Sequence, residues 1–314
     1  MDTRGRLTLA SVGAAGLFLL VELGALALAE PFVSAGYQAV KDPGNPANSL
    51  LYLVAILVMT GILLVIIRFG ATWLLRAVII LLSAMLTWYV FSVVVPVLGG
   101  PSGVVAPTVL AGVVALALYV HPEWYVIDVA GVLIGAGGAG LFGISFGPLP
   151  AVLLLLALAV YDAVAVYGTR HMLTLAESVT TLKLPLLLVV PLSSAYSFLD
   201  EGPLDTDAET APEEREAFFI GVGDAVMPTI LVASAAVFVG APSLGVPGLA
   251  LNLPALGALL GTQLGLLALL WLVARGRPQA GLPLLNGGAI LGFLVGALLA
   301  GVPLVQALGL APYL

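Results

Sequence analysis

The sequence contains no cysteine, only two histidines and few charged residues. Asp, Glu, Lys and Arg together make up 9% of its 314 residues, whereas 61% are hydrophobic. Without cysteine the chain can form neither disulfides nor a thiol nucleophile, and two histidines are too few for a histidine-based metal site. We therefore expect no metal and no other cofactor. So few charges cannot cover a soluble domain, and the composition predicts a polytopic membrane protein embedded in the lipid bilayer.

The hydrophobic residues are concentrated in nine stretches that are long enough, or nearly so, to cross about 30 Å of hydrocarbon as α-helices. The sequence therefore predicts an all-α polytopic fold of nine transmembrane helices, forming a single membrane domain over residues 1–314. In chain order the stretches are Leu7 to Ala29, Leu50 to Ile67, Trp73 to Leu98, Val104 to Val120, Tyr125 to Phe142, Leu149 to Tyr167, Phe218 to Phe238, Leu253 to Ala274 and Leu284 to Leu308.

Lys and Arg are scarce, but their positions predict the orientation of the chain. Nine of the ten lie before the first stretch, or in or close to connections on the same side as it, and only Lys41 lies on the opposite side. Because basic residues accumulate in cytoplasmic loops, we predict a cytoplasmic N-terminus and an external C-terminus, with the cell membrane as the expected location. There is no basic patch, so nucleic acid is not an expected partner.

One long connection, residues 168–217, separates the six predicted helices of residues 1–167 from the three of residues 218–314. Its first half, Leu173 to Leu192, mixes polar residues with leucines and contains two prolines, which predicts an amphipathic interfacial helix followed by a short apolar dip. Its second half, Asp200 to Glu216, is rich in Asp and Glu and is predicted to lie in the cytoplasm. A solvated loop without a role is the alternative.

Two acids, Asp162 and Asp224, each lie inside a hydrophobic stretch, where a carboxylate costs at least about 2–3 kcal/mol to place. The two stretches flank the long connection. In the predicted orientation, helix rise places Asp162 about 7 Å and Asp224 about 9 Å from the cytoplasmic ends of their helices. The carboxylates are therefore expected at matched depth near the cytoplasmic boundary. A membrane crossing by Leu182 to Leu192 would instead move Asp224 to the opposite leaflet.

Two carboxylates that meet in a weakly solvated site hold one proton between them, because both cannot ionise cheaply. The ionised member can then take a proton from water while the protonated member polarises a carbonyl oxygen, which is the chemistry of aspartic peptide hydrolysis. Gly221 and Gly223, beside Asp224, would let another helix or a substrate backbone come close. The residues by themselves predict a paired acid site, compatible with hydrolysis or with proton transport.

Tyr161-Asp162 and Gly221-Val222-Gly223-Asp224 resemble the Tyr-Asp and Gly-x-Gly-Asp motifs of the presenilin and signal peptide peptidase family of intramembrane aspartyl proteases. The resemblance covers essentially the whole chain. It implies an endopeptidase that cleaves transmembrane helices of other membrane proteins, with Asp162 and Asp224 as the catalytic pair and Tyr161, Gly221 and Gly223 shaping the site. The orientation implies substrates with an external N-terminus. Assembly of the chain into a homo-oligomer is compatible with the sequence.

The third motif of that family, Pro-Ala-Leu, has two candidate positions in the chain. Pro254-Ala255-Leu256 matches it literally but opens the eighth stretch, whereas the family carries the motif at the start of the ninth. We therefore assign the role to Pro283, Leu284 and Leu285, and attribute Pro254 to the first turn of a helix. Because Pro283 lacks an N–H, we expect it to delay the start of the helix and to leave extended backbone for a substrate strand.

Two other functions fit the same acids. The main alternative is a proton-coupled secondary transporter or an ion leak that uses them as a relay, and the second is a non-catalytic scaffold. The two halves of the sequence show no clear inverted repeat, which argues against a transporter. Asn in place of either acid would abolish cleavage by a protease, whereas a transporter would show pH-dependent flux without a cleaved product.

Three further features are assigned structural roles. Gly135 to Gly140 lies within a hydrophobic stretch and predicts a face for close helix packing. Glu22, in the first stretch, is expected to be hydrogen-bonded within the bundle. Asp128, close to the cytoplasmic end of its stretch, is expected to reach the membrane interface.

Overall fold

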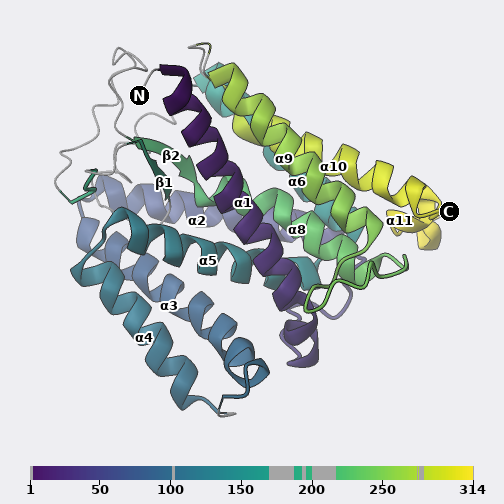
Figure 1. The fold of residues 1–314 in the computed structure, drawn as a ribbon, viewed down its shortest axis with the longest axis horizontal. Coiled ribbons are helices and arrows are strands. Elements are labelled where there is room, and N and C mark those ends of the chain that lie inside the picture. The colour runs from purple at the N-terminus through teal and green to yellow at the C-terminus, as the bar shows by residue number, and fades with distance from the viewer. Residues whose placement is uncertain are drawn as a thin grey trace.

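Nine helices of at least 16 residues make up most of the chain that the structure describes. The computed structural model describes residues 3–100, 103–169, 187–192, 196–199, 217–273, 275 and 279–313. Seven of the helices are long and apolar enough to span a membrane, and α4 and α8 are shorter apolar helices. In chain order the nine are α1 (Thr3–Ser34), α2 (Ala47–Arg68), α3 (Thr72–Val97), α4 (Val105–Val120), α5 (Trp124–Ser145), α6 (Pro148–Val164), α8 (Val222–Phe238), α9 (Leu253–Val273) and α10 (Gly281–Leu299) (Figure 1).

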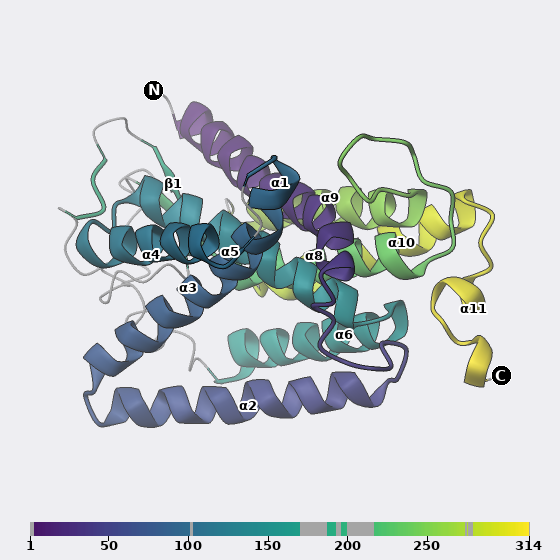
Figure 2. The same cartoon turned by 90° about the horizontal axis from the view of Figure 1, so that it is seen from below.

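Helix α8 occupies the centre of the bundle, where it contacts α1, α5, α6, α9 and α10. Figures 1 and 2 show α3 and α4 on one side of α1 and α5, and α9 and α10 on the other side. The middle of α8, from Ile230 to Ala235, is buried at every position. A helix that is apolar all round belongs in the interior, and this one carries Asp224 in its first turn.

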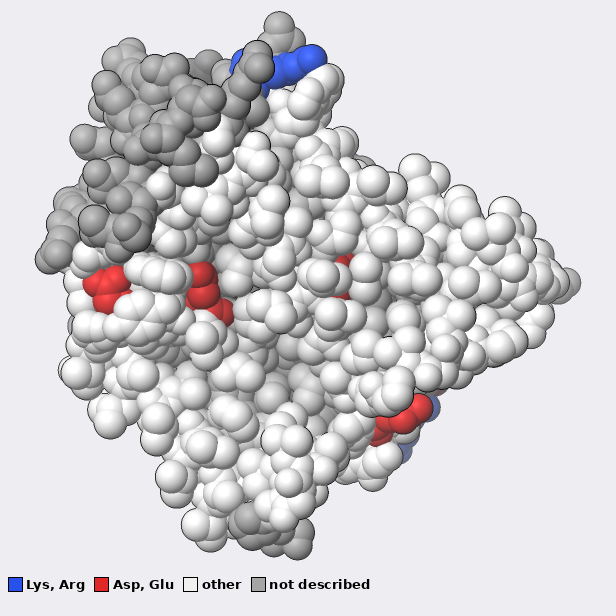
Figure 3. Space-filling view, viewed as in Figure 1, with Lys and Arg blue, Asp and Glu red and all other residues white. Residues whose placement is uncertain are grey.

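The outer surface of the bundle is apolar. Figure 3 shows a face on which charged side chains form only small, separate patches. Large hydrophobic side chains are exposed along α2, for example Leu50, Val58 and Val65. In water such a surface would promote aggregation, whereas in a bilayer it contacts lipid hydrocarbon. The packing therefore agrees with the predicted membrane protein.

The start of the seventh predicted helix is wrong by four residues, because Phe218 to Gly221 belongs to a β-strand. Strand β2 (Ala217–Gly221) pairs antiparallel with β1 (Leu187–Pro191), and Val189 lies opposite Phe219. Aromatic and β-branched residues favour such pairing. The predicted interfacial helix and apolar dip are also wrong for Leu187–Pro191, which therefore makes no membrane crossing. The rest of those calls, and the acidic segment of residues 200–216, lie outside the described residues.

The end of the ninth predicted helix is also wrong. The prediction runs to Leu308, but α10 ends at Leu299 and a short helix, α11 (Leu304–Ala307), follows it, with a 3₁₀ turn, η2 (Ala311–Tyr313), closing the described chain. Gly301, between the two helices, has a φ of 72°, a left-handed conformation that stops α10 and that glycine adopts without strain.

Asp128 of α5 holds β1 itself, and Glu123, at the N-cap of α5, holds the chain that follows β1. The carboxylate of Asp128 accepts a hydrogen bond of 2.7 Å from the amide of Val189, and Glu123 accepts bonds from the Ser197 hydroxyl and the Phe198 amide at 2.6 and 3.0 Å. Asp128 is therefore buried, at 8% exposure, and the expectation that it reaches the interface is wrong. Asp128 is buried because it accepts the hydrogen bond of the Val189 amide, which has no other acceptor among the described contacts.

The glycine run of α5 is a packing face, as predicted. A Cβ on Gly135 would lie 3.2 Å from Val21 of α1, and one on Gly140 would lie 3.1 Å from Phe32. Further along α5, a Cβ on Gly143 would overlap Ala233 of α8. Without side chains at these positions the helix backbones approach closely, which replaces the hydrophobic effect as a driving force between helices in lipid.

Helices α9 and α10 approach each other even more closely. Glycines line both sides of their contact, and a Cβ on Gly261 would overlap the carbonyl oxygen of Gly288, as would one on Gly257 with Gly292. Because backbone rather than side-chain atoms are in the way, no rotamer change could make room. The glycines therefore fix the position of α10 against α9.

We predict that Gly261→Ala destabilises the protein by about 1–3 kcal/mol, because the added methyl group forces the two backbones apart. Gly61→Ala is the matched control, since a Cβ on Gly61 of α2 has no neighbour within 4 Å. The control should be neutral or stabilising by up to about 1 kcal/mol through helix propensity. Thermal unfolding in detergent measures both, and equal midpoints for the two variants would contradict the packing argument.

We predict that Glu123 contributes stability that is lost in acid. Burial alone would raise the pKa of Glu123, but the bonds from Ser197 and from the amides of Phe198 and Leu199 lower it below the ordinary value of 4.5. The contribution of Glu123 is therefore complete above about pH 4.5 and disappears as the pH falls through the lowered pKa.

Glu123→Gln should therefore unfold at a lower temperature than the parent at neutral pH, and the difference should vanish on acidification. Thermal unfolding measured across a pH series tests this. Glu30→Gln, at an exposed acid of α1, is the control. A stability difference that stays constant from neutral to acidic pH would show that the ionised Glu123 is not what holds the segment.

Candidate active site

Asp162 lies in the last turn of α6, at the point where the α-helix gives way to a π-helical turn, η1 (Ala165–Thr169). Its side chain is 6% exposed. The Oδ2 atom accepts a hydrogen bond of 3.0 Å from the amide of Leu282, and the carboxylate also accepts from the amide of Gly281. Both donors belong to the first turn of α10, where amides have no partner within the helix. The positive end of the helix dipole therefore faces this carboxylate.

Asp224 lies in the first turn of α8, directly after β2. The chain passes from strand to helix at Gly221, whose backbone is extended with φ −62° and ψ 132°. The Asp224 carboxylate accepts from the amide of Gly221, and a Cβ on Gly221 would lie 3.3 Å from Asp224 Oδ2. Glycine therefore leaves room for the carboxylate to fold back onto the junction.

The two carboxylates converge on the same short segment of chain. Asp162 binds the amides of Gly281 and Leu282, while Asp224 Oδ2 lies 4.0 Å from the place where a Cβ on Gly281 would be. Both acids therefore lie beside the first turn of α10, where Asp162 is buried and Asp224 is partly exposed.

The residues that contact the aspartates from α10 were missed by the sequence argument. Gly281 and Leu282 lie immediately before Pro283, so a motif of a small residue, Leu and Pro would have found them. The expectation that Pro283 delays the helix is wrong. The helix begins at Gly281, and Pro283 lies within its first turn, where the missing N–H removes no helical bond.

The other predicted site residues lie at different distances from the aspartates. Tyr161 is 52% exposed on α6, and Gly223 has open space where its side chain would be. Leu285 is fully buried in a cluster with residues of α1 and β1, while Leu284 lines a groove between α9 and α10. Of this set, Gly221 alone has a described contact with an aspartate side chain.

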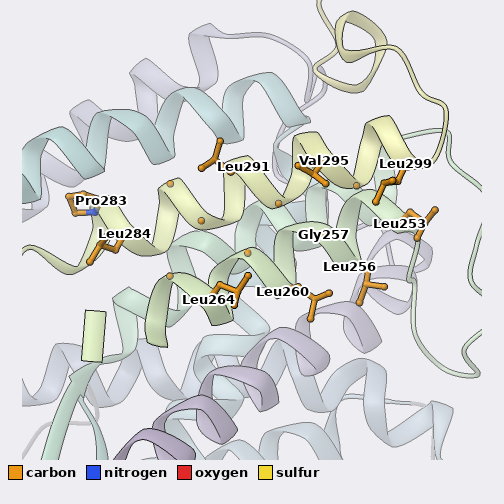
Figure 4. A pocket seen from close by; sticks show the side chains of 16 residues that line it. Leu253, Leu256, Gly257, Leu260, Leu264, Pro283, Leu284, Leu291, Val295 and Leu299 are labelled. Carbon is orange, nitrogen blue, oxygen red and sulfur yellow. The ribbon is translucent and has the colours of Figure 1, made fainter. Parts of the chain in front are cut away.

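An apolar groove of about 680 Å³ runs between α9 and α10, starting at the active-site end of α10 (Figure 4). Pro283 and Leu284 line one end of it, and Leu253 and Leu299 line the other. Its walls are leucine and valine, and its floor is the glycine contact described above. Pro254 also lies at that far end, where a Cβ on Gly296 would touch it, so the literal Pro-Ala-Leu sequence is remote from Gly281.

Two further buried polar side chains tie helices together. Glu22 is completely buried and accepts a hydrogen bond of 2.7 Å from Gln263, as expected for a side chain bonded within the bundle. Asn286, one turn beyond Leu282, donates to the carbonyl oxygen of Leu155 at 2.9 Å. This bond joins α10 to α6 along the same face that carries the contact between Leu282 and Asp162.

Comparison with known proteins gives the same result from independent data. A family described as signal-peptide peptidase, presenilin aspartyl protease matches residues 15–302. Two solved structures, both of a presenilin family intramembrane aspartate protease, in space groups C222 and P2, are each 39% identical to the chain. The first covers 92% of this chain and 99% of its own at a TM-score of 0.68, and the second 91% and 97% at 0.65.

No curated protein sequence matches the chain. The family match extends over far more than half of the sequence, and the solved structures share its length almost entirely. A multi-pass integral membrane protein with two converging acids is what such a protease requires. The chain therefore belongs to the presenilin and signal peptide peptidase family, and it is an intramembrane aspartyl protease of the Gly-x-Gly-Asp type.

Proposed function

We propose that Asp162 and Asp224 together activate the water that hydrolyses peptide bonds in transmembrane helices. The observation that supports this most directly is their convergence on Gly281 and Leu282. Two carboxylates from different helices lie beside the same turn there, next to backbone amides that can orient them. A transporter that used the acids as a relay would need a path through the bundle, and the described contacts do not favour such a path over hydrolysis.

The reaction follows from one proton shared by the pair. The ionised carboxylate takes a proton from water, and the oxygen of that water bonds to the scissile carbonyl carbon. The protonated carboxyl gives its proton to the carbonyl oxygen in the same step. The carboxyl that took the proton from water then gives it to the amide nitrogen, while the other carboxylate takes a hydroxyl proton from the tetrahedral intermediate. The carbon–nitrogen bond breaks, an acid and an amine leave, and the pair is back in its starting protonation state. The atoms of water and of the peptide bond are all accounted for in the two products, so the reaction balances without a cofactor.

The remaining sequence-predicted residues are proposed to shape the site. Gly221 keeps the space beside Asp224 free for its carboxylate, and Gly223 leaves open space on the neighbouring turn. Pro283 and Leu284 form the start of the α9–α10 groove, and Leu285 holds α10 in the core. Tyr161, adjacent to Asp162 and half exposed, is placed to contact a substrate from the outer side of α6.

We further propose that all nine long helices cross the cell membrane as one domain, with the N-terminus in the cytoplasm and the C-terminus outside. The distribution of Lys and Arg supports this orientation. It puts the aspartates near the cytoplasmic boundary, together with the connection of residues 168–217. Every substrate helix with an external N-terminus would then present its backbone to the aspartates in the same N-to-C direction.

A substrate helix must unwind before it is cut, because a helical backbone hides its carbonyl groups. Strand β2 offers a partner for the unwound segment, since it ends at Gly221 and leads within three residues to Asp224. An extended substrate that adds to the outer edge of β2 would regain hydrogen bonds that it lost on unwinding. Its scissile bond would then be carried towards the two acids.

We predict that Asp162→Asn and Asp224→Asn each reduce product formation by on the order of 10³-fold or more, because neither amide can accept the proton from water. Glu22→Gln, at a buried acid outside the site, is the matched control and should retain activity. Mass spectrometry of transmembrane peptides incubated in vesicles measures the products, with helices supplied in both orientations. Cleavage by the Asn variants, or cleavage of only those helices with an internal N-terminus, would contradict the proposal.

We predict that an unwound substrate lies beside β2. Because the chain has no cysteine, a single Ile220→Cys can be introduced into the inactive Asp224→Asn protein and paired with a substrate that has one Cys near its cleavage site. A disulfide should form there. Leu244→Cys, exposed in the loop beyond the other end of α8, is the control and should stay unlinked. Equal yields at the two positions would argue against strand addition to β2.

A further inference from the structure

The outer edge of β1 is occupied by a buried carboxylate. In an antiparallel pair, the N–H and C=O groups of one residue point to the same side of the strand, and successive residues alternate. The amide of Val189 donates to Asp128 of α5 at 2.7 Å, so Val189 directs its backbone groups away from β2. Leu187 and Pro191, two residues to either side, share that direction.

Pro191 strengthens this closure, because proline has no N–H to donate. Three residues of β1 point outward. Pro191 has no amide N–H, and the amide of Val189 is bonded to Asp128. A strand that added to this edge could therefore use neither of these two positions as a donor. Buried charges and prolines are the usual means by which proteins block a sheet edge. The sheet is therefore closed along β1.

The same alternation leads from Asp128 to the active site through β2. Gly221 lies opposite Leu187 and Phe219 lies opposite Val189, so both share the outward direction on the other side of the sheet. The amide of Gly221 does point outward, since it donates to Asp224. The opposite edges of one two-stranded sheet are thus capped by two carboxylates, Asp128 on β1 and Asp224 on β2.

Helix α5 presses Asp128 against the strand. A Cβ on Gly131 would lie 2.9 Å from the Leu188 side chain, and Ile127 and Ala130 pack with Val189 in one buried cluster. Asp128 itself is 8% exposed, so its carboxylate has lost most of its contact with solvent and accepts a hydrogen bond from the Val189 amide instead. A buried acid with so few donors is costly unless it holds something in place.

We propose that Asp128 is a positioning residue for Asp224, acting through β1 and β2. It fixes the height and rotation of β1 against α5, pairing transmits that placement to β2, and the Gly221 amide transmits it to the Asp224 carboxylate. This role rests on the proposed catalytic use of Asp224. The bond to Val189 needs an acceptor oxygen and not a charge, and that requirement separates the role from a general electrostatic one.

The test compares two substitutions of the same residue. Asp128→Asn keeps an acceptor oxygen for Val189 and should retain kcat within about 3-fold. Asp128→Leu removes that oxygen at similar volume and should lower kcat by about 10- to 100-fold. KM should change much less, because the substitution displaces Asp224 relative to Asp162 and leaves the substrate-binding surface in place. Val129→Leu, at the neighbouring lipid-facing position of α5, is the matched control. If Asp128→Leu does not fold, Asp128→Ala carries the same expectation.

Hydrogen exchange followed by mass spectrometry supplies a readout that is independent of activity. Asp128→Leu should accelerate exchange in residues 187–191 and 217–221, and Asp128→Asn should not. Equal loss of kcat in the Asn and Leu variants, or unchanged strand exchange in Asp128→Leu, would overturn the inference. Failure of the catalytic proposal is recognised separately, as cleavage by Asp224→Asn, and the exchange data still decide whether Asp128 holds the strands.

Discussion

An acid placed inside a membrane-spanning bundle must be given hydrogen-bond donors, and in this protein backbone amides supply most of them. Asp162 binds the first-turn amides of α10, Asp224 binds Gly221, and Asp128 binds Val189. A backbone amide remains in place after any substitution other than proline, and it cannot leave by a rotamer change. The carboxylates are therefore held wherever the chain leaves an amide unpaired, which is at helix starts and strand edges.

The position of α10 consequently decides the geometry of the site. Its first turn supplies the donors to Asp162, and its backbone lies beside Asp224. Two unrelated contacts hold the helix there: the glycine-to-glycine contact with α9, and the bond from Asn286 to the Leu155 carbonyl of α6. The first excludes side chains and the second satisfies a polar group, so the placement combines van der Waals packing with one directional bond.

The sequence predicted the parts of this arrangement that depend on long hydrophobic runs. The helices, and the placement of Asp162 and Asp224 on two that flank the long connection, follow from where apolar residues and acids occur along the chain. The strands did not, because five-residue apolar segments such as Leu187–Pro191 cannot be told from helical ones by composition. The donors to Asp162 were missed because the ninth helix was predicted to begin at Leu284, three residues after its observed start at Gly281, and periodicity does not encode the exact start of a helix. The partner of Asp128 is a backbone amide, which leaves no trace in the sequence.

Both aspartates lie where regular secondary structure changes. Asp162 precedes the π-helical turn of α6, and Asp224 follows the passage from β2 into α8. Within an uninterrupted helix every amide is already paired, so neither carboxylate could have been satisfied by backbone in the middle of a span. A substrate faces the same rule, because its scissile bond becomes accessible only where its own helix is interrupted. The enzyme meets that interruption with extended backbone of its own, where β2 leads into α8 and the first turn of α10 lies beside Asp224.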